Sequence, residues 1–475
     1  RVISDIERIQ YFGECYRVTR SNGAVRTIPK SEVILEANCL YDGNARALFD
    51  YFKETASALS LKTDGGANIL QLQYDRISAV PESTILAKYL NPKLPVRPAE
   101  KPAALIYPFG LNQSQKQAVE NAFSAPISMI QGPPGTGKTQ TILNILANAV
   151  RMGKTVAIVS NNNSATQNVA EKLAKYDLGF LTAFLGSLAN KERFLTGQTG
   201  SYPDMGSWIL EKSVQETLLR QVRSLSEELT AMLEARNRAA QVDRELLELK
   251  PEQFYFGKYY EAKGSGGFNT ETFPRLSSEK LMTLWLEYEA KGQKKPGFFR
   301  RILLALRFGR GALSLFDQTP EAAIPFLQKQ FYQARLRELR AEKEKLEQKL
   351  RAYRFDAKIE ELREESMKLF KAELAERYPW RSPRQTFEQK DFRGASEAFS
   401  AEYPVILSTT YAIKGTLSTD FFYDYLIVDE ASQVDLATGV LAFSCARNIV
   451  IVGDQKQLPN VLTQEDIRIA DEIWN

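Results

Sequence analysis

The most constraining feature of the sequence is an eight-residue string that satisfies the pattern GxxxxGK[ST] in full. It lies between the apolar run 127–130, which is typical of a strand, and a helix-like segment that begins at Lys138. Glycines in such a loop let successive backbone N–H groups turn toward phosphate oxygens, where a side chain would block the approach. Lys138 can neutralise the β- and γ-phosphates, Thr139 can bind Mg²⁺, and the helix start adds its positive end. We therefore expect a nucleotide site made of Gly132, Pro133, Pro134, Gly135, Thr136, Gly137, Lys138, Thr139 and Gln140.

Further apolar runs resemble the one that precedes this loop. Each is short, rich in β-branched residues and followed by a polar residue; they span 155–159, 405–407, 425–428 and 449–452. Such runs indicate parallel strands that are buried on both faces, with ligands bound at the carboxyl edge of the sheet. The predicted fold class is therefore α/β, with a parallel sheet.

The alternation of strands and helices is interrupted between residues 173 and 401, a stretch too long for a structureless loop. Apolar residues recur there at coiled-coil spacing among many charged residues. They are Leu218, Val222, Leu225, Leu229 and Met232 in one stretch, and Leu336, Leu339, Leu346, Leu350 and Tyr353 in another. We expect two long antiparallel helices that carry residues 250–325 at their tip. The alternative is two ordinary amphipathic helices packed on the core.

Asp429 and Glu430 follow the apolar run 425–428, at the expected carboxyl edge of the sheet. A first carboxylate there can hold Mg²⁺, and a second can orient and deprotonate the attacking water. On its own, a strand-end acidic pair is more often a solvated turn. Beside a complete phosphate loop it predicts metal-assisted hydrolysis of a phosphoanhydride, with ATP and Mg²⁺ as cofactors and with Thr139 and Asp429 as the metal ligands.

The composition excludes several classes of protein. The sequence has no histidine, which excludes Ser-His-Asp and Cys-His catalysis and histidine-bound zinc or haem. Its three cysteines are far apart, so reduced thiols and a cytoplasmic location are expected. No apolar run is long enough to span a bilayer, so no membrane association is expected. The net charge of +4 is small, and any nucleic-acid site must be a local patch.

Two further strings narrow the function. Asp429-Glu430-Ala431-Ser432-Gln433 and Gly453-Asp454-Gln455-Lys456-Gln457-Leu458-Pro459 resemble motifs II and III of superfamily 1 helicases, in the branch that contains the nonsense-mediated-decay RNA helicase. The strings at 111–115, 160–165 and 408–410 resemble the Q motif, motif Ia and motif Ic of that branch. The resemblance implies a RecA-like P-loop domain in an ATP-dependent helicase or translocase that acts on single-stranded DNA or RNA.

The resemblance also implies roles for single residues. Gln115 would pair with an adenine edge, and Gln457 would sense the γ-phosphate and join Lys138, Asp429 and Glu430 as a catalytic residue. The nucleic-acid backbone would be bound by neutral donors, which are Asn162, Asn163 and Thr409. Taken singly, these three are more often turn caps. Gln455 stands where many relatives carry histidine, so no role is carried over to it.

Two rival functions belong to other classes. A chromosome-organising ATPase of the structural-maintenance type also inserts a coiled coil between its two ATP motifs. That family needs a Leu-Ser-Gly-Gly signature, which the string Leu417-Ser418-Thr419-Asp420 does not supply. The other rival is a nucleic-acid-binding module that only retains the fold. The intact Lys138, Thr139, Asp429 and Glu430 argue against it.

The remaining expectations concern organisation. Residues 1–90 read as a mixed β/α module with a hairpin turn at Asn22-Gly23 and a helix capped by Asn44. Only sixteen residues follow Pro459, so a second RecA-like domain is expected in a longer chain. The predicted divisions are the module at 1–90, a proline-rich linker at 91–110, the RecA-like ATPase domain at 111–190 and 401–475, and the helical insertion at 191–400.

The insertion contains one strongly basic segment. Residues 291–311 carry cations and no acid, with phenylalanines interleaved; the cations are Lys291, Lys294, Lys295, Arg300, Arg301, Arg307 and Arg310. One interpretation is a phosphate-binding surface with rings that stack on bases. The other, slightly favoured, is an amphipathic helix whose Ile302, Leu303 and Leu306 face a core. The insertion is also a candidate surface for a protein partner.

Overall fold

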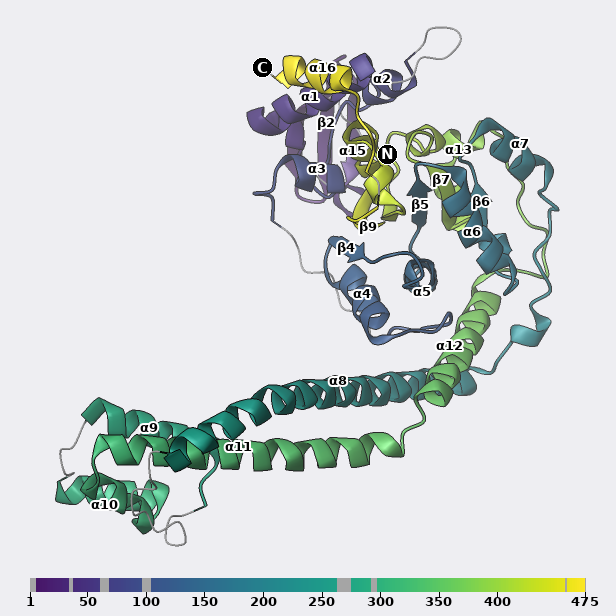
Figure 1. Cartoon of the computed structure of the whole chain (residues 1–475). Helices are drawn as coiled ribbons and strands as arrows, with labels where there is room; N and C mark the ends of the chain where they lie inside the picture. Colours follow the sequence, from purple (N-terminus) through teal and green to yellow (C-terminus); the bar gives the residue numbers. More distant parts are fainter. Residues whose placement is uncertain are drawn as a thin grey trace. The chain divides into compact units, whose positions relative to one another are not determined.

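The computed structural model of this chain describes residues 6–33, 37–59, 68–95, 104–262, 275–291, 297–457 and 459–474. It consists of two compact units, shown along one chain in Figure 1. The first contains the described residues up to Leu225 together with those from Ile359 onward, and the second contains Ser226–Lys358. Each unit is considered by itself below.

The first unit is built on a parallel sheet with the order β4-β9-β8-β5-β7-β6. Its strands are β4 (Ile127–Gln131), β5 (Val156–Ser160), β6 (Thr182–Phe184), β7 (Val405–Thr409), β8 (Tyr423–Val428) and β9 (Ala446–Gly453). Every residue of β5 and β7 is buried, as expected for β-branched strands covered on both faces. The α/β prediction is confirmed. The short edge strand β6 was not predicted from the sequence.

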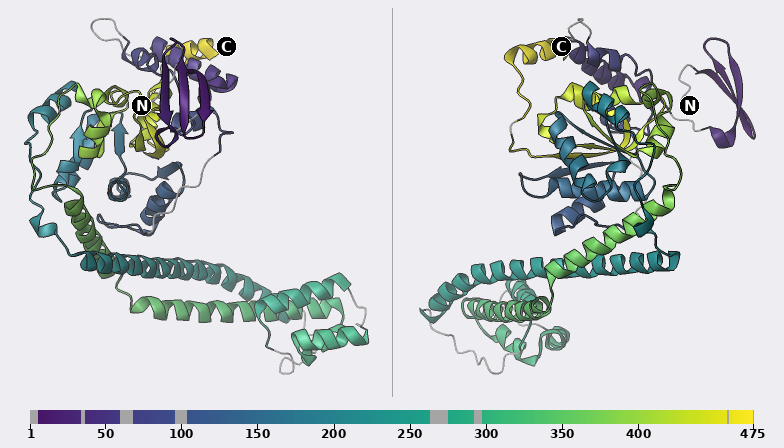
Figure 2. Two further views of the ribbon diagram at one scale, coloured as in Figure 1. Left: turned by 180° about the vertical axis from the view of Figure 1, so that it is seen from behind. Right: turned by 90° about the vertical axis from the view of Figure 1, so that its right-hand side faces the viewer.

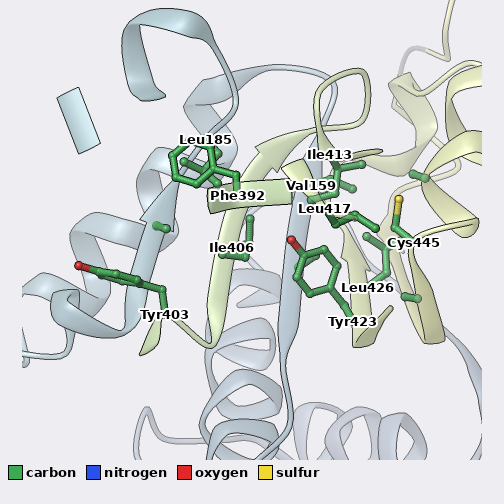
Figure 3. Close-up of a cluster of buried hydrophobic side chains, with 14 of the residues drawn as sticks. Val159, Leu185, Phe392, Tyr403, Ile406, Ile413, Leu417, Tyr423, Leu426 and Cys445 are labelled. Carbon is green, nitrogen blue, oxygen red and sulfur yellow. The ribbon is translucent and has the colours of Figure 1, made fainter. Parts of the chain in front are cut away.

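Helices and short 3₁₀ turns complete the first unit. The helices that accompany the sheet are α4 (Gln113–Ser124), α5 (Lys138–Arg151), α6 (Asn163–Ala174), α7 (Leu188–Thr196), α13 (Asp391–Gly394), α14 (Ser396–Glu402) and α15 (Leu436–Phe443). A further helix, α16 (Gln464–Trp474), packs against α1 (Gly43–Leu59; Figure 1). The 3₁₀ turns are η1 (Lys30–Glu32), η2 (Cys39–Tyr41), η3 (Gly179–Leu181), η4 (Gly206–Trp208), η6 (Ile413–Thr416) and η7 (Ala431–Gln433). Figure 3 shows part of the core, where Ile406 of β7 and Leu426 of β8 belong to one apolar cluster with Phe392, Tyr403 and Tyr423.

The N-terminal residues form a separate antiparallel sheet with the order β1-β2-β3. Its strands are β1 (Ile6–Phe12), β2 (Cys15–Arg20) and β3 (Val25–Pro29), and Figure 2 shows them from two sides. Gly23, in the predicted turn between β2 and β3, has φ +82°, a conformation that favours glycine. The predicted hairpin is therefore confirmed, and β1 adds a strand that was not predicted.

Three helices follow: α1 (Gly43–Leu59), α2 (Ile69–Tyr74) and α3 (Ile85–Leu90). They share a buried cluster with α15, and the Tyr74 hydroxyl donates to the carbonyl of Ala437 at 2.6 Å. The prediction that Asn44 caps α1 is wrong. The cap acceptor is the Asp42 carboxylate, which accepts from the backbone N–H groups of Asn44 and Ala45 at 3.0 Å, because the helix begins at Gly43, two residues earlier than a cap at Asn44 implies.

The second unit is a helical hairpin with a small tip. It contains the greater part of α8 (Lys212–Ala262), then α9 (Ser278–Lys291), α10 (Phe298–Phe308), η5 (Arg310–Asp317), α11 (Pro320–Arg351) and the first turn of α12 (Phe355–Arg377). Val242 and Leu246 of α8 pack against Leu336 and Leu339 of α11, and the two helices run side by side in both views of Figure 2. The predicted inserted helical hairpin is confirmed. Its description as a coiled coil stays a prediction.

Ion pairs tie the two long helices together. The Arg238 guanidinium donates to the Glu342 carboxylate at 2.6 Å, and Arg335 donates to Glu245 at 2.5 Å. Lys343 pairs with Asp243 in the same way.

No helix within the described ranges combines the length and the apolar character needed to cross a bilayer.

Two details of the insertion could not be read from the sequence. Leu218 and Val222 of the first apolar stretch belong to the first unit, and the residues that pack against Leu336 and Leu339 are Val242 and Leu246, further along α8. Helical spacing defines which residues share a face but not the register between two helices. The favoured interpretation of the basic segment, an amphipathic helix, is right about the helix but wrong about its buried face. Ile302, Leu303 and Leu306 are exposed, and the buried residues of α10 are Leu304 and Phe308. Lys294 and Lys295 lie outside the described residues.

Candidate nucleotide-binding site

The phosphate-loop residues lie between β4 and α5, where the sequence predicted them. Gly135 and Gly137 have φ +84° and +83°, a left-handed backbone conformation that residues other than glycine rarely adopt. The Lys138 ammonium donates to the carbonyl of Gly132 at 2.6 Å, and the Thr136 hydroxyl donates to the carbonyl of Pro133 at 2.8 Å. These two bonds fold the loop back toward its first residues. Residues 133–136 at the crest of the loop are exposed, so an anion can reach the loop, as a phosphate cradle requires.

Gln115 links α4 to this loop. Its Nε2 donates to the carbonyls of Thr136 and Gly137 at 3.2 Å and to Oε1 of Gln140 at 3.0 Å. Its Oε1 accepts from the backbone N–H of Asn112 at 2.7 Å, the residue whose side chain caps α4. The buried Gln115 side chain is therefore fully engaged with the protein. Its pairing with adenine stays a prediction, and the structure adds a second role, which is to fix the loop.

Asp429 and Glu430 follow β8, next to β5 in the sheet. Asp429 is buried, and burial raises the pKa of its carboxyl above the usual range, while the hydrogen bond from the Glu430 backbone N–H opposes part of the rise. The Glu430 N–H donates to Oδ1 of Asp429 at 2.9 Å, and Glu430 has φ +53°, an unusual conformation for a non-glycine residue. A buried first carboxylate and a more accessible second one suit a metal ligand and a base, respectively.

The loop after β9 brings Gln457 to the same edge. The Gly132 N–H donates to the carbonyl of Gly453 at 3.2 Å, so this loop starts beside the phosphate loop. Asp454 is buried, and its Oδ1 accepts from the backbone N–H of Lys456 at 2.9 Å, which shapes the turn that carries Gln457. Gln455 accepts a side-chain bond from Gln131 at 3.3 Å. The part of the string at 458 lies outside the described residues.

The predicted nucleic-acid residues lie on the neighbouring loops. Asn162 precedes α6, and its Oδ1 caps that helix by accepting from the N–H groups of Ser164 and Ala165 at 3.1 and 3.3 Å. Asn163 and Thr409 lie beside Gly186, and the Thr409 hydroxyl donates to the Gly186 carbonyl at 3.3 Å. The structure thus brings them to one edge. Their contact with nucleic acid stays a prediction.

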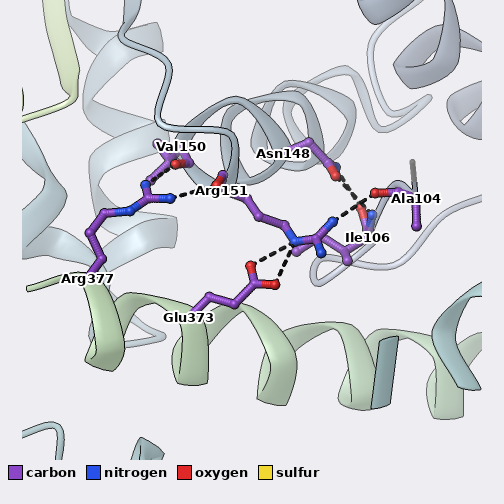
Figure 4. Close-up of polar contacts among 7 residues, drawn as sticks. All are labelled: Ala104, Ile106, Asn148, Val150, Arg151, Glu373 and Arg377. Carbon is purple, nitrogen blue, oxygen red and sulfur yellow. Dashed lines mark hydrogen bonds and ion pairs between the residues drawn. The ribbon is translucent and has the colours of Figure 1, made fainter. Parts of the chain in front are cut away.

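Sequence reasoning missed how α5 is held. The buried Asn148 and Asn144 side chains bond the segment 104–110, with Asn148 Oδ1 accepting from the Ile106 N–H at 2.9 Å. At the carboxyl end of α5, Arg377 of α12 donates to the carbonyl of Arg151 at 2.6 Å, and Arg151 pairs with Glu373 at 2.7 Å (Figure 4). A hollow of about 610 Å³ lies beside these residues, at the other end of α5 from Lys138.

The residues at the site suit a cation that is shared with phosphate. No cluster of three or more His, Cys, Asp or Glu side chains within the described parts of the chain could hold a metal. The Thr139 hydroxyl at the start of α5 and the Asp429 carboxylate after β8 are hard oxygen donors. Mg²⁺ commonly takes one or two protein oxygens and completes its shell with phosphates and water.

Comparison with known proteins finds a family match over the residues that carry this site. The family AAA_11, described as an AAA domain, matches residues 110–465. The rat DNA-binding protein SMUBP-2 is 37% identical over 95 residues, which are 20% of this chain and 10% of that protein. The Drosophila melanogaster Regulator of nonsense transcripts 1 homolog is 44% identical over 69 residues, 14% of this chain and 6% of that protein.

A third relative is the human DNA replication ATP-dependent helicase/nuclease DNA2. It is 37% identical over 94 residues, which are 20% of this chain and 9% of that protein. The matched stretches therefore span about a tenth or less of the length of these relatives.

Proposed function

Since this chain belongs to the AAA_11 family of AAA domains, which are superfamily 1 helicases of the nonsense-mediated-decay branch, we propose that it is an ATP-dependent helicase or translocase. Its substrate would be single-stranded DNA or RNA. The observation that carries the proposal is that the phosphate loop, the Asp429-Glu430 pair and the Gln457 loop meet at one carboxyl edge of the sheet. The family match favours this function over the structural-maintenance alternative.

The proposed chemistry divides among this chain's own residues. Lys138 binds the β- and γ-phosphates, and Thr139 with Asp429 would hold Mg²⁺, which supplies charge neutralisation on the phosphates when bound. Glu430 orients and deprotonates the attacking water, and Gln457 senses the γ-phosphate. Gln115 and Gln140 would position the adenine side of ATP. The exposed loop crest and the half-buried Thr139 support this assignment.

Nucleic acid would bind through Asn162, Asn163 and Thr409, at the edge that also carries Glu430. The names of the relatives, which include a DNA-binding protein, a regulator of nonsense transcripts and a DNA replication helicase, support a nucleic-acid substrate. The free thiols of the three cysteines support a reducing, intracellular location. The helical insertion would add a surface for a protein partner.

The binding test uses the full-length protein with labelled single strands and blunt duplexes over a range of salt. We expect preference for single strands with weak dependence on base sequence, and affinity that falls steeply as salt rises. Asn163→Ala and Thr409→Ala remove neutral contacts, so they should weaken binding at every salt concentration without changing the salt slope. A sequence-specific, salt-insensitive footprint on duplex DNA would contradict the proposal.

A further inference from the structure

Helix α10, at the tip of the second unit, carries apolar side chains on two of its sides (Figure 1). Leu304 and Phe308 are buried and belong to one cluster with Leu284 and Tyr288 of α9. Other apolar side chains of the same helix are exposed, by 46% to 86%; they are Phe298, Phe299, Ile302, Leu303 and Leu306. A contiguous exposed set of large apolar side chains marks an interaction surface. The exposed side of α10 is therefore a candidate interface.

The exposed residues have the spacing of a surface that packs on another helix. Phe299, Ile302, Leu303 and Leu306, called the α10 stripe below, follow the pattern i, i+3, i+4 and i+7. Side chains in that pattern fill the grooves of a second helix that lies along the first. Three of the four are aliphatic, and aliphatic side chains cannot stack on nucleotide bases as aromatic rings do. The pattern thus favours a protein helix over a nucleic-acid strand.

Arginines border the α10 stripe on both sides. On one side, the Arg307 guanidinium donates to Oε1 of Glu287 at 3.0 Å, and Arg300 lies 3.7 Å from Oε2 of the same carboxylate. On the other side, Arg301 is exposed and has no ion pair within the described ranges. Residues 291–311 contain no acid at all. Guanidinium groups hold planar carboxylates through two parallel hydrogen bonds, so the complement of the Arg301 edge is a carboxylate.

This distribution of charge disfavours two other occupants. A second copy of the chain would bring arginines beside arginines, because the segment is basic throughout. An anionic membrane attracts helices that are rich in free cations along the polar face. Here Arg300 and Arg307 already share Glu287, so the free positive charge of the helix lies at the Arg301 edge. A one-sided row of carboxylates on a partner helix matches that edge.

We propose that the α10 stripe binds an acidic amphipathic helix of a partner protein. The apolar residues of the partner pack on the stripe, and its carboxylates pair with Arg301. This inference specifies the partner surface named in the proposed function and rests on that part of it alone. No residue of the nucleotide site takes part, so the two proposals can fail separately.

The test measures the fluorescence anisotropy of a labelled synthetic peptide as full-length protein is added. The peptide is a helix-forming sequence with leucines at i, i+3, i+4 and i+7 and glutamates along one edge. A second peptide has the same composition with its leucines scrambled. We expect saturable binding of the first peptide and at least about ten-fold weaker binding of the second, because burying a single leucine is worth that factor.

Two variants and a control locate the site. Leu306→Ser removes an 83% exposed side chain of the stripe and should weaken binding about ten-fold or more at every salt concentration. Arg301→Glu should weaken binding at low salt, with a difference that shrinks as salt rises. The same variant should bind a peptide with lysines in place of glutamates more tightly than the wild type does. The control is Leu247→Ser in α8, a 71% exposed leucine outside α10, which should leave binding unchanged.

The proposal is overturned if the acidic peptide does not bind, or if Leu306→Ser and Leu247→Ser bind it equally well. It is also overturned if Arg301→Glu binds the acidic peptide as the wild type does. Another occupant replaces the partner helix if Leu306→Ser instead abolishes binding to phosphatidylglycerol vesicles or to single-stranded DNA, or dissociates a wild-type dimer seen by sedimentation.

Thermal unfolding checks that each variant is folded, and Arg301→Glu serves if Leu306→Ser is not. ATP turnover with single strands is measured on the same preparations, and Leu306→Ser should match the wild type there. Wild-type protein that binds the peptide but hydrolyses no ATP refutes the proposed function and leaves the partner surface standing.

Discussion

Gly137→Ala should destabilise the phosphate loop by more than its backbone conformation alone can explain. Gly137 has φ +83° and ψ 26°, and a Cβ atom there would lie 2.0 Å from Nε2 of Gln115. The added methyl group must push the Gln115 amide away from its bonds to the loop. Gly135 offers a matched control, because it has φ +84° and a Cβ atom added there would have no neighbouring atom within 4 Å.

The magnitude follows from two contributions. An alanine in a left-handed conformation costs roughly 1–2 kcal/mol, and this applies to both glycines. Displacing Gln115 also breaks its bonds of 3.0–3.2 Å to Thr136, Gly137 and Gln140. The amide nitrogen has two N–H groups, so two full bonds at ~0.5–1.5 kcal/mol each add about 1–3 kcal/mol at Gly137 only. We expect Gly137→Ala to cost about 2–5 kcal/mol and Gly135→Ala about 1–2 kcal/mol.

The assay is urea-dependent hydrogen exchange of the amides in α5. It reports the opening free energy of that helix, whereas a chain of two units has no single unfolding free energy. A double-mutant cycle isolates the contact, since in the Gln115→Ala background the extra cost at Gly137 should vanish. The reasoning is refuted if Gly137→Ala and Gly135→Ala cost the same, or if the excess persists without the Gln115 side chain.

Three other predictions concern charged side chains. Lys138→Ala should abolish ATP hydrolysis and weaken nucleotide binding. Glu430→Gln should bind ATP normally but hydrolyse it at least about 10²-fold more slowly. Equilibrium ATP binding and turnover assays distinguish the two variants. Burial raises the pKa of Asp429 in the folded state, so the ionisation of this carboxyl opposes folding. The protein therefore loses stability as the pH rises from the ordinary carboxyl pKa through the raised pKa of Asp429. Asp429→Asn should therefore raise the opening free energy of the β8 amides at pH 7, measured by hydrogen exchange, and remove this loss; a lower value would contradict the sign. Arg384 pairs with Glu402 at 2.7 Å with both side chains largely buried, so Arg384→Leu should cost about 3–5 kcal/mol in the opening free energy of the α14 amides. Adding Glu402→Gln should recover part of that cost.

The location of the phosphate loop and of the acidic pair could be predicted because both depend on residue types at fixed short spacings. A phosphate loop needs glycines, lysine and threonine within one string, and the acidic pair must follow a buried strand. Both features are local, and the structure places them as expected. Two features of Glu430 could not be predicted: its left-handed backbone and the hydrogen bond that its Oε2 accepts from Nδ2 of Asn162 at 3.3 Å. Both depend on how close the loops after neighbouring strands lie.

Tertiary packing also decided the features that sequence reasoning missed. Asn144 and Asn148 look like unremarkable helix residues, yet they bond the segment 104–110, which lies more than thirty residues earlier. The periodicity of α10 correctly indicated a helix, but periodicity does not tell which face is buried. Leu303 and Leu306 are 64% and 83% exposed, so the expected core contact was wrong.

The most direct test of the account is steady-state ATP turnover by the full-length protein as single-stranded nucleic acid is added. The account predicts that turnover rises and saturates with single-stranded DNA or RNA, rises far less with blunt duplex, and is absent in Lys138→Ala. Turnover that is the same with and without every nucleic acid, or a protein that binds no ATP, would contradict it.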